Sequence, residues 1–537
     1  MSDVIDGVFD GYQRHLLEFT PVTATAKGDH RRDADLDDWL PGAGDERLRD
    51  LGRLRAKLNA IEDLLDEEVE GDRLMLANAL DARRFTLDGL RSHERDPAFW
   101  LDIVTRGVHE LIRRDDLDPG PRQLAAASRA AQVPRLLDQA RATLDGITAP
   151  HREVALLRTP GAVALFRDTL VEFTPKAAEA AEAAALACEK FAAWLDERRD
   201  DPAPDWRLGE KRWSQALRLM LGARMPATRI WESAWAELDT LQAMAEETAF
   251  VVLEGHRDGR AGPDLVRAGL EIVAADRASR EGLVGEAAVV LGEIAAFVRD
   301  TGLFPLPEPD TLRVEELPQF MRGVFGACLA PAPPLEPTAT HTYYVSPVPA
   351  DWDDERATSF LREYNRSALR LLGIHEAYPG HYVQCAHARA HPRLLRRMLI
   401  NHAFLEGWAV YVEHEVVSAG FGDAALGLTS TKLTLRTVTN ALLDQGLHVH
   451  GWDDDTAIKL MVNQAYQEPT EATAKLLRGK VTAGQLSTYF VGGQEMASLR
   501  AEVEQLCGPG FSAAEFHEEV LAHGTPPFAV LRRALVE

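Results

Sequence analysis

Cysteine is scarce in this chain. Its 537 residues include only Cys188, Cys328, Cys385 and Cys507, which lie far apart and form no CxxC pair. A disulfide framework or a thiolate zinc site needs closely spaced cysteines. The sequence therefore favours neither of them.

Long apolar runs are absent as well. A helix that spans a membrane needs about 18 or more consecutive apolar residues, and the sequence contains no such run. The opening residues, MSDVIDGVFDGYQRH, are acidic and lack the apolar segment of a signal peptide. We therefore expect a cytoplasmic protein that does not bind membranes.

Positive charge is in deficit. The chain has 59 Lys and Arg against 84 Asp and Glu, which gives a formal net charge of −25. Such a chain would repel a phosphate backbone, so a nucleic-acid partner is not expected. In a chain of this length, 46% of hydrophobic residues is enough to form more than one core.

What the sequence does have is helical periodicity. Apolar residues recur every three or four positions through most of the chain, as on the buried face of a helix. The composition changes at 301–350, where ten prolines occur. We predict an all-α protein with an N-terminal helical lobe over 1–300, a proline-rich connector over 301–350 and a C-terminal helical region over 351–537 that carries the chemistry.

The connector contains the best candidate for a strand. In HTYYVSP, residues 341–347, the aromatic side chains of Tyr343 and Tyr344 favour a pleated surface, and Pro347 ends it. An edge strand here could bind an extended peptide by strand addition. A buried extended loop is the alternative. A short helix is predicted near 314–328.

The stretch LLGIHEAYPGHYVQ, residues 371–384, carries the clearest chemistry. In the familiar HExxH pattern, two histidines four residues apart bind zinc, and the glutamate after the first one is the general base. Here His375 and His381 are six residues apart, which on an ideal helix turns the second about 120° from the first. Pro379 and Gly380 supply a kink or bulge that returns His381 to the metal.

Glu376 is then the candidate base, and Glu406 the candidate third ligand, because a zinc hydrolase needs a carboxylate beside its imidazoles and a position left for water. Glu406 lies on a helix expected to begin at Pro392 and to end near Gly420. Glu413 is two turns further on the same face. It either orients a ligand histidine or is a solvated or ion-paired carboxylate.

HEAYPGH followed by EGWAVYVE resembles the signature of a bacterial family known as domain of unknown function 885. That family is regarded as related to the gluzincins, helical zinc peptidases such as thimet oligopeptidase, neurolysin and angiotensin-converting enzyme. The resemblance covers most of the chain, since EFTPVTATAKGDHRRDADLDDW is similar to the family's opening and LLDQGLHVHGW, AGQLSTY, SLR and AAEFHEEVLAHGTPPFAVL follow its C-terminal blocks. The offset of 25 residues from His381 to Glu406 is close to the ligand spacing of the oligopeptidases.

The resemblance implies a two-lobed, gluzincin-like helical fold with a central cleft, and one Zn²⁺ per chain. By analogy a tyrosine hydroxyl stabilises the oxyanion. Tyr489 is the candidate, and a packed core tyrosine is the alternative. His448 is a second candidate donor, or the cap of a helix end. Arg436 and Arg478 either bind a peptide carboxylate or form structural ion pairs.

Three functions are compatible with these residues. The first is a zinc metallopeptidase that hydrolyses short peptides with Glu376 as general base. The second is another zinc amide hydrolase, acting on a small acylated metabolite through the same metal site. The third is a non-enzymatic helical binding protein with a vestigial site, against which Glu376 argues because metal binding does not require it. Histidine and carboxylate ligands suit zinc but also admit other divalent ions.

Overall fold

The computed structural model describes residues 2–61, 67–222, 225–318, 326–336, 338–350, 352–482 and 484–537. It is 72% helical with one small sheet, which confirms the predominantly helical fold. The chain forms two compact units, each with its own hydrophobic core. Unit 1 holds the residues up to Trp206 and a return at 333–339, and unit 2 holds the other described residues from Arg207 on.

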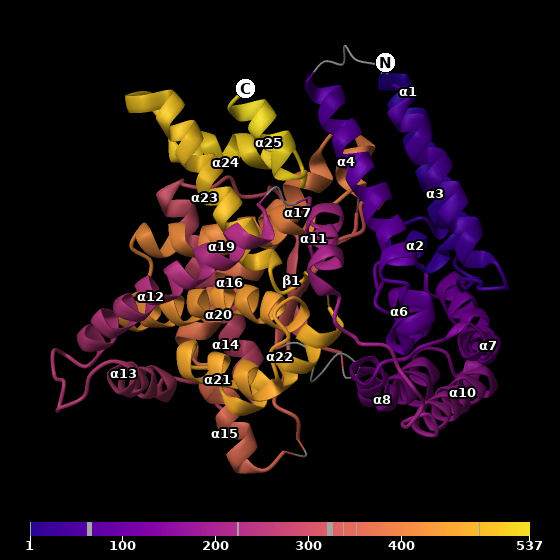
Figure 1. Cartoon of the computed structure of the whole chain (residues 1–537), viewed down its shortest axis with the longest axis horizontal. Helices are drawn as coiled ribbons and strands as arrows, with labels where there is room; N and C mark the ends of the chain where they lie inside the picture. The colour runs from indigo at the N-terminus through magenta and orange to yellow at the C-terminus, as the bar shows by residue number, and fades with distance from the viewer. Residues whose placement is uncertain are drawn as a thin grey trace. The chain divides into compact units, whose positions relative to one another are not determined.

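Unit 1 is helical throughout its described part (Figure 1). Its α-helices are α1 (Ser2–Phe19), α2 (Pro21–Ala26), α3 (Ala43–Asn59), α4 (Glu67–Arg84), α5 (Ser92–Arg95), α6 (Pro97–Ile112), α7 (Pro119–Thr143), α8 (Ala149–Ala164), α9 (Val171–Phe173) and α10 (Ala178–Asp196). Short π or 3₁₀ turns are η1 (His30–Arg32), η2 (Phe85–Gly89), η3 (Leu165–Leu170) and η4 (Pro175–Ala177). The alanine-rich face of α10 packs against α7 and α8, because small side chains let helix axes approach closely.

Unit 2 contains the remaining helices (Figure 1). They are α11 (Gly209–Met220), α12 (Ala227–Val252), α13 (Pro263–Ala275), α14 (Leu283–Thr301), α15 (Asp354–Glu363), α16 (Arg366–Glu376), α17 (His381–Ala390), α18 (Leu394–Met398), α19 (His402–Ser418), α20 (Ala424–His448), α21 (Asp454–Gln464), α22 (Pro469–Val481), α23 (Thr488–Cys507), the 3₁₀ turn η6 (Gly508–Gly510), α24 (Ala513–Ala522) and α25 (Phe528–Leu535). No described helix is both long and apolar enough to cross a membrane.

The boundary between the units differs from the one expected at residue 300. Helices α12, α13 and α14 belong to unit 2, because α12 packs along α20 and α14 packs against α16. Their apolar faces share one core with the helices that carry the histidines; Ile230, Ile294 and Ile374 are all fully buried in it. Periodicity reveals that a helix has an apolar face, but not which later helix covers it.

The sheet of unit 2 has the strand order β1-β3-β2. Strand β3 (His341–Val345) runs parallel to β1 (Leu312–Glu316) and antiparallel to β2 (Ala327–Ala330). A strand is present at HTYYV as expected, but the expectation of an edge strand is wrong. Both edges of β3 are already paired, so it has no free edge for an added peptide.

Two local expectations are also corrected. The prediction of a short helix near 314–328 is wrong at both ends of that range, because they lie in strands β1 and β2. Residues 319–325, in the middle of the range, are outside the described part. The long helix expected from Pro392 is two helices, α18 and α19. Asn401 caps α19, since its side chain accepts a hydrogen bond from the Phe404 N–H at 3.0 Å. The end of α19 just before Gly420, which has a φ of +99°, is as expected.

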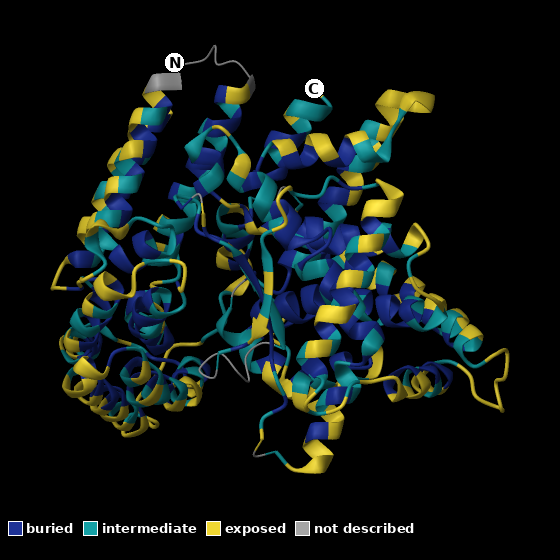
Figure 2. Ribbon diagram, turned by 180° about the vertical axis from the view of Figure 1, so that it is seen from behind, coloured by how far each residue is buried: buried dark blue, intermediate teal, exposed yellow. Residues whose placement is uncertain are grey.

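Buried residues gather on the inward faces of the helices, and exposed ones on their outer faces (Figure 2). Helix α20 is an exception in unit 2, because every residue from Val438 to His448 is buried. A helix that is covered all round lies in the interior of its unit. It contacts α12, α16 and α23, and it therefore joins the helices that carry the candidate site.

Helices α19 and α23 approach each other through two glycines. A Cβ atom on Gly407 would overlap with the Gly492 carbonyl oxygen, and a Cβ atom on Gly492 would overlap with the Ala403 carbonyl oxygen. The two backbones are thus in direct contact, and no other residue type fits at this crossing. Because Gly407 follows Glu406, the same contact fixes the position of the candidate ligand.

We predict that Gly407→Ala lowers the free energy of unfolding by about 1–3 kcal/mol, as is usual when atoms are forced into a packed interior. Urea denaturation followed by circular dichroism measures this. Gly427→Ala, on α20, is the control. Its new Cβ would meet only Thr248 Cγ2 at 3.6 Å, so it should leave stability unchanged or raise it. Equal stability of the two variants would contradict the close crossing.

Candidate metal centre

The two histidines of HEAYPGH lie on either side of a break between helices. Helix α16 ends at Glu376 and α17 begins at His381. The helix is therefore interrupted rather than bulged, which removes the angular mismatch of a six-residue spacing. Gly380 lies so close to His375 that a Cβ atom would overlap with the His375 carbonyl oxygen. The Tyr378–Pro379 peptide bond is cis.

Side-chain hydrogen bonds hold this break from two directions. From α19, Trp408 Nε1 donates to the Pro379 carbonyl oxygen at 2.9 Å. From the segment before β1, Asp310 accepts hydrogen bonds from the hydroxyl groups of Tyr378 at 2.6 Å and Tyr382 at 2.9 Å. The non-helical turn is thus fixed by groups outside α16 and α17.

Three ligand atoms converge at the break. Nε2 of His375 and Nε2 of His381 each lie 3.5 Å from Oε2 of Glu406, and one ligand atom from each residue falls within 4.8 Å of the others. Two ligands of a tetrahedral zinc ion, with bonds of about 2.0–2.1 Å, are separated by about 3.3 Å. Glu406 Oε2 is buried and has no hydrogen-bond partner among the described residues. The three residues therefore fit a divalent metal ion.

The charges of this trio are strongly coupled. Burial lowers the pKa of His375, but Glu406 and Glu413 beside it outweigh burial and raise that pKa well above its ordinary value. Burial raises the pKa of Glu406, but the two imidazoles outweigh it and hold that pKa well below the usual range. Without a metal ion, a proton on His375 offsets part of the negative charge of Glu406 and Glu413. A metal ion can take over that role.

Glu413 orients the first histidine. Its Oε1 lies 2.6 Å from Nδ1 of His375. A carboxylate that accepts from Nδ1–H leaves Nε2 as the free ligand atom, and here Nε2 faces Glu406. Of the two interpretations of Glu413, the geometry favours the orienting role. The corresponding nitrogen of His381, Nδ1, is buried without a hydrogen-bond partner among the described residues.

Glu376 is beside the trio but not part of it. Its Oε2 accepts a hydrogen bond of 2.8 Å from the backbone N–H of Leu329 in β2, and Oε1 remains for a proton. Tyr343, on β3, is fully buried close to Glu376; burial and then Glu376 raise the pKa of its hydroxyl well above the ordinary value. Tyr344 is buried as well and stands opposite Cys328 of β2 in the sheet register.

Tyr489 stands near the carboxylates of the centre. It is at the start of α23, and Glu406, followed by burial, raises the pKa of its hydroxyl to about 12. The hydroxyl is therefore protonated at neutral pH and able to donate. Nη2 of Arg478 lies 3.5 Å from that oxygen and 2.8 Å from Oε1 of Gln485.

The remaining two predicted residues have other partners. Arg436 forms ion pairs with Glu363, at 3.2 Å, and with Glu471. His448 is buried; its Nε2 lies 2.8 Å from the Gly479 carbonyl oxygen, and its Nδ1 accepts from the backbone N–H of Leu208 at 3.4 Å. These contacts favour the structural alternatives for both residues.

Sequence reasoning missed two groups at the centre. The position of Asp310 could have marked it as a candidate, because it is an acidic residue in the proline-rich segment just before a strand. The sequence gives no signal for the Leu329 N–H, because every residue except proline has a backbone N–H. Only the strand pairing reveals which N–H is available to a side chain.

Comparison with known proteins places the chain in a family. The model of a family described as "Bacterial protein of unknown function (DUF885)" matches residues 21–535. The chain belongs to the DUF885 family. No curated protein matches it.

Two solved structures share this DUF885 fold. One, a putative lipoprotein of unknown function from Shewanella oneidensis, is 25% identical, with a TM-score of 0.83 and 99% of each chain covered. The other, a putative lipoprotein from Colwellia psychrerythraea, is 17% identical, with a TM-score of 0.82 and 99% of this chain and 98% of that chain covered.

We predict that Glu413→Gln weakens metal binding about 10- to 100-fold, because His375 loses the carboxylate that orients it. Isothermal titration of the chelator-treated protein with Zn²⁺ measures the affinity. Glu415→Gln is the matched control on the same helix. Its carboxylate pairs with Arg500 instead, so its zinc affinity should equal that of the wild type. Unchanged affinity in Glu413→Gln would remove the orienting role.

Proposed function

We propose that this DUF885 protein is a metal-dependent peptidase, most simply a zinc enzyme, that hydrolyses short peptides. One observation carries the proposal. Two imidazoles and a carboxylate converge on one point, while a further carboxylate, Glu376, stands beside them with one oxygen free. A protein that only bound metal would not need that fourth group, whereas hydrolysis needs a base beside the ion.

The site's surroundings support a small substrate. The side chains of His375, His381 and Glu406 are only 15%, 10% and 18% exposed. The surface of a folded protein does not reach groups so deeply placed, so the proposal is limited to short peptides. HEAYPGH and EGWAVYVE resemble the signature of a family that is regarded as related to the gluzincin peptidases, and this supports peptides as the substrate class. A cytoplasmic location stays a prediction.

In the proposed reaction, a divalent ion held by His375, His381 and Glu406 would lower the pKa of a water molecule to about 7. Glu376 takes one proton from that water on Oε1, while the Leu329 N–H holds Oε2. The oxygen of the water forms a bond to the peptide carbonyl carbon. Glu376 then gives its proton to the amide nitrogen as the carbon–nitrogen bond breaks, and the products are a carboxylic acid and an amine.

Tyr489 completes the proposal as the donor to the oxyanion. Its hydroxyl keeps its proton at neutral pH, because its pKa is raised to about 12. A protonated hydroxyl close to the metal ligands can hold the negative charge that develops on the carbonyl oxygen. Glu413 acts through His375, which it keeps oriented.

The first test measures metal content and turnover together. Protein purified without chelator should contain about one zinc per chain by mass spectrometry. His381→Ala should lose the metal, because it removes a ligand. Glu376→Gln should keep the metal and lose about 100-fold or more in kcat on a library of short fluorogenic peptides. A zinc-loaded wild type that hydrolyses no peptide would sink the peptidase proposal.

The second test separates Tyr489 from the metal ligands. Tyr489→Phe removes only the hydroxyl group. We expect kcat to fall about 100- to 1,000-fold, with KM and zinc content little changed, because a single oxyanion donor contributes that much. Tyr344→Phe, on β3, is the control and should keep full kcat. A normal kcat in Tyr489→Phe would contradict the oxyanion role and favour the alternative, a packed core tyrosine.

A further inference from the structure

Helix α22 carries a row of charged residues. Glu471, Lys475 and Arg478 follow one another at spacings of four and three, which places them on one helix face. Arg436 of α20 reaches the same face, because it pairs with Glu471. The charged groups here are the cations Lys432, Arg436, Lys475 and Arg478 and the carboxylates Glu363 and Glu471, four positive charges against two negative ones. A local positive excess is unexpected in a chain with a net charge of −25.

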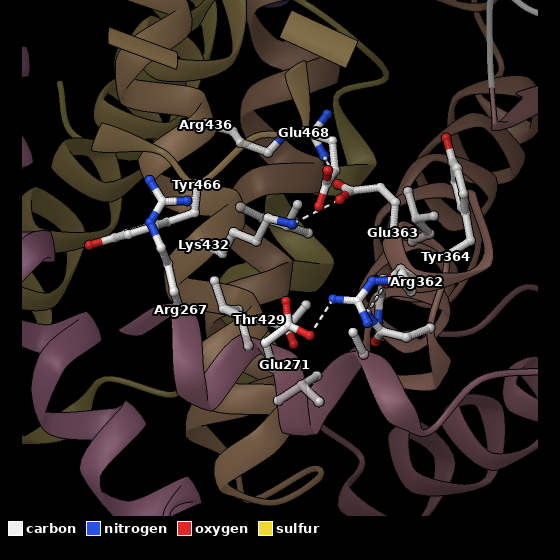
Figure 3. A pocket seen from close by; sticks show the side chains of 17 residues that line it. Arg267, Glu271, Arg362, Glu363, Tyr364, Thr429, Lys432, Arg436, Tyr466 and Glu468 are labelled. Carbon is white, nitrogen blue, oxygen red and sulfur yellow. Dashed lines mark hydrogen bonds and ion pairs between the residues drawn. The ribbon is translucent and has the colours of Figure 1, made fainter. Parts of the chain in front are cut away.

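Both carboxylates already have a cationic partner, although Oε2 of Glu471 is buried without a hydrogen-bond partner among the described residues. Glu363 accepts from Lys432 at 2.8 Å and from Arg436 at 3.2 Å, and Glu471 pairs with Arg436. Glu363, Lys432 and Arg436 border a cavity of about 200 Å³, in which Arg362 pairs with Glu271 at 2.5 Å in the same way (Figure 3). Of the four cations that line the cavity, Lys432, Arg436 and Arg362 have carboxylate partners. The fourth, Arg267, donates to the Val462 carbonyl oxygen at 3.2 Å.

Lys475 has no such partner. It is only 9% exposed, and it forms neither a hydrogen bond nor an ion pair with any described residue. Burial, followed by the nearby Arg436, lowers the pKa of its ammonium group well below the ordinary value. An unpaired cation in such a place costs stability, and an arriving anion would remove that cost.

Arg478 is the second cation that has no carboxylate partner in the described part of the chain. Its guanidinium group donates to Oε1 of Gln485 and approaches the Tyr489 hydroxyl at 3.5 Å. A guanidinium that is held by a neutral amide keeps its charge available to an anion. The Tyr489 contact places this charge next to the metal ligands, since Glu406 is the main cause of the raised pKa of Tyr489.

We propose that Lys475 and Arg478 form a receptor for a carboxylate group of the substrate, on the side of the metal centre marked by Tyr489. The carboxylate is either the free C-terminus of a peptide or the side chain of an acidic residue. This inference rests on the proposed function, because it names the substrate class of the same centre. The proposal assigns to Lys475 the carboxylate-binding role that the sequence suggested for Arg436, because Arg436 is ion-paired with Glu363 and Glu471.

The test measures equilibrium binding and needs no turnover. The background is zinc-loaded Glu376→Gln, in which hydrolysis is blocked. The probes are N-terminally fluorescent tri-alanine as the free acid and as the C-terminal amide, and the same amide with Asp or Asn as its last residue. Fluorescence anisotropy gives the Kd of each. A receptor for the chain terminus binds the acid at least about tenfold more tightly than the amide. A receptor for the side chain binds the Asp amide more tightly than the Asn amide by the same factor.

Lys475→Met and Arg478→Met should each abolish this preference. Lys480→Met is the matched control on α22, because Lys480 already pairs with Asp454 at 2.7 Å; it should keep the full preference. Lys475→Met should also unfold at a higher urea concentration than the wild type, since it removes an unpaired buried charge. A purely structural lysine would give the opposite change.

Two outcomes overturn the receptor. One is equal affinity for acid and amide together with equal affinity for the Asp and Asn probes. The other is a preference that survives in Lys475→Met and Arg478→Met. Neither outcome touches the proposed function, which fails instead when the wild type holds no zinc or hydrolyses no peptide. The same anisotropy measurement on metal-free protein shows whether the receptor binds carboxylates without the ion.

Discussion

The interruption between α16 and α17 is the constraint on which the centre depends. Two histidines six residues apart cannot face one ion from a continuous helix. The chain resolves this by ending one helix at Glu376 and starting another at His381. The turn between them is held by Trp408 of α19 and by Asp310 before β1. The helix that carries Glu406 thus also holds the turn that positions His381.

Much of this arrangement was readable from the sequence. Periodicity gave the helical class, and the types and spacing of His375, Glu376, His381 and Glu406 gave the candidate site. Packing between distant segments was not readable, which explains why 207–301 belongs with the C-terminal helices and why β3 is central. The same limit applies to Lys475. Its spacing from Arg478 suggests a shared face, but only the structure shows that Arg436 takes both nearby carboxylates.

The two sides of the centre carry opposite charge. Around the three ligand atoms the balance is acidic, with Glu376, Glu406 and Glu413 facing two imidazoles. On the α22 side it is basic, because Lys475 and Arg478 have no carboxylate partner among the described residues. Tyr489 lies between these regions and responds to both, because Glu406 raises its pKa and Arg478 lowers it. A polar substrate that carried a carboxylate would meet opposite fields at its two ends.

The crossing of α19 and α23 has a consequence for how this architecture can change over time. At Gly407 and Gly492 the two helices touch through their main chains, so their separation does not depend on the size of any interlocking side chain. Glu406 and Tyr489 are carried by these same helices. Side chains elsewhere on both helices can therefore be exchanged while the distance between ligand and hydroxyl is preserved. A site built in this way tolerates extensive sequence drift, provided that two positions stay without a side chain.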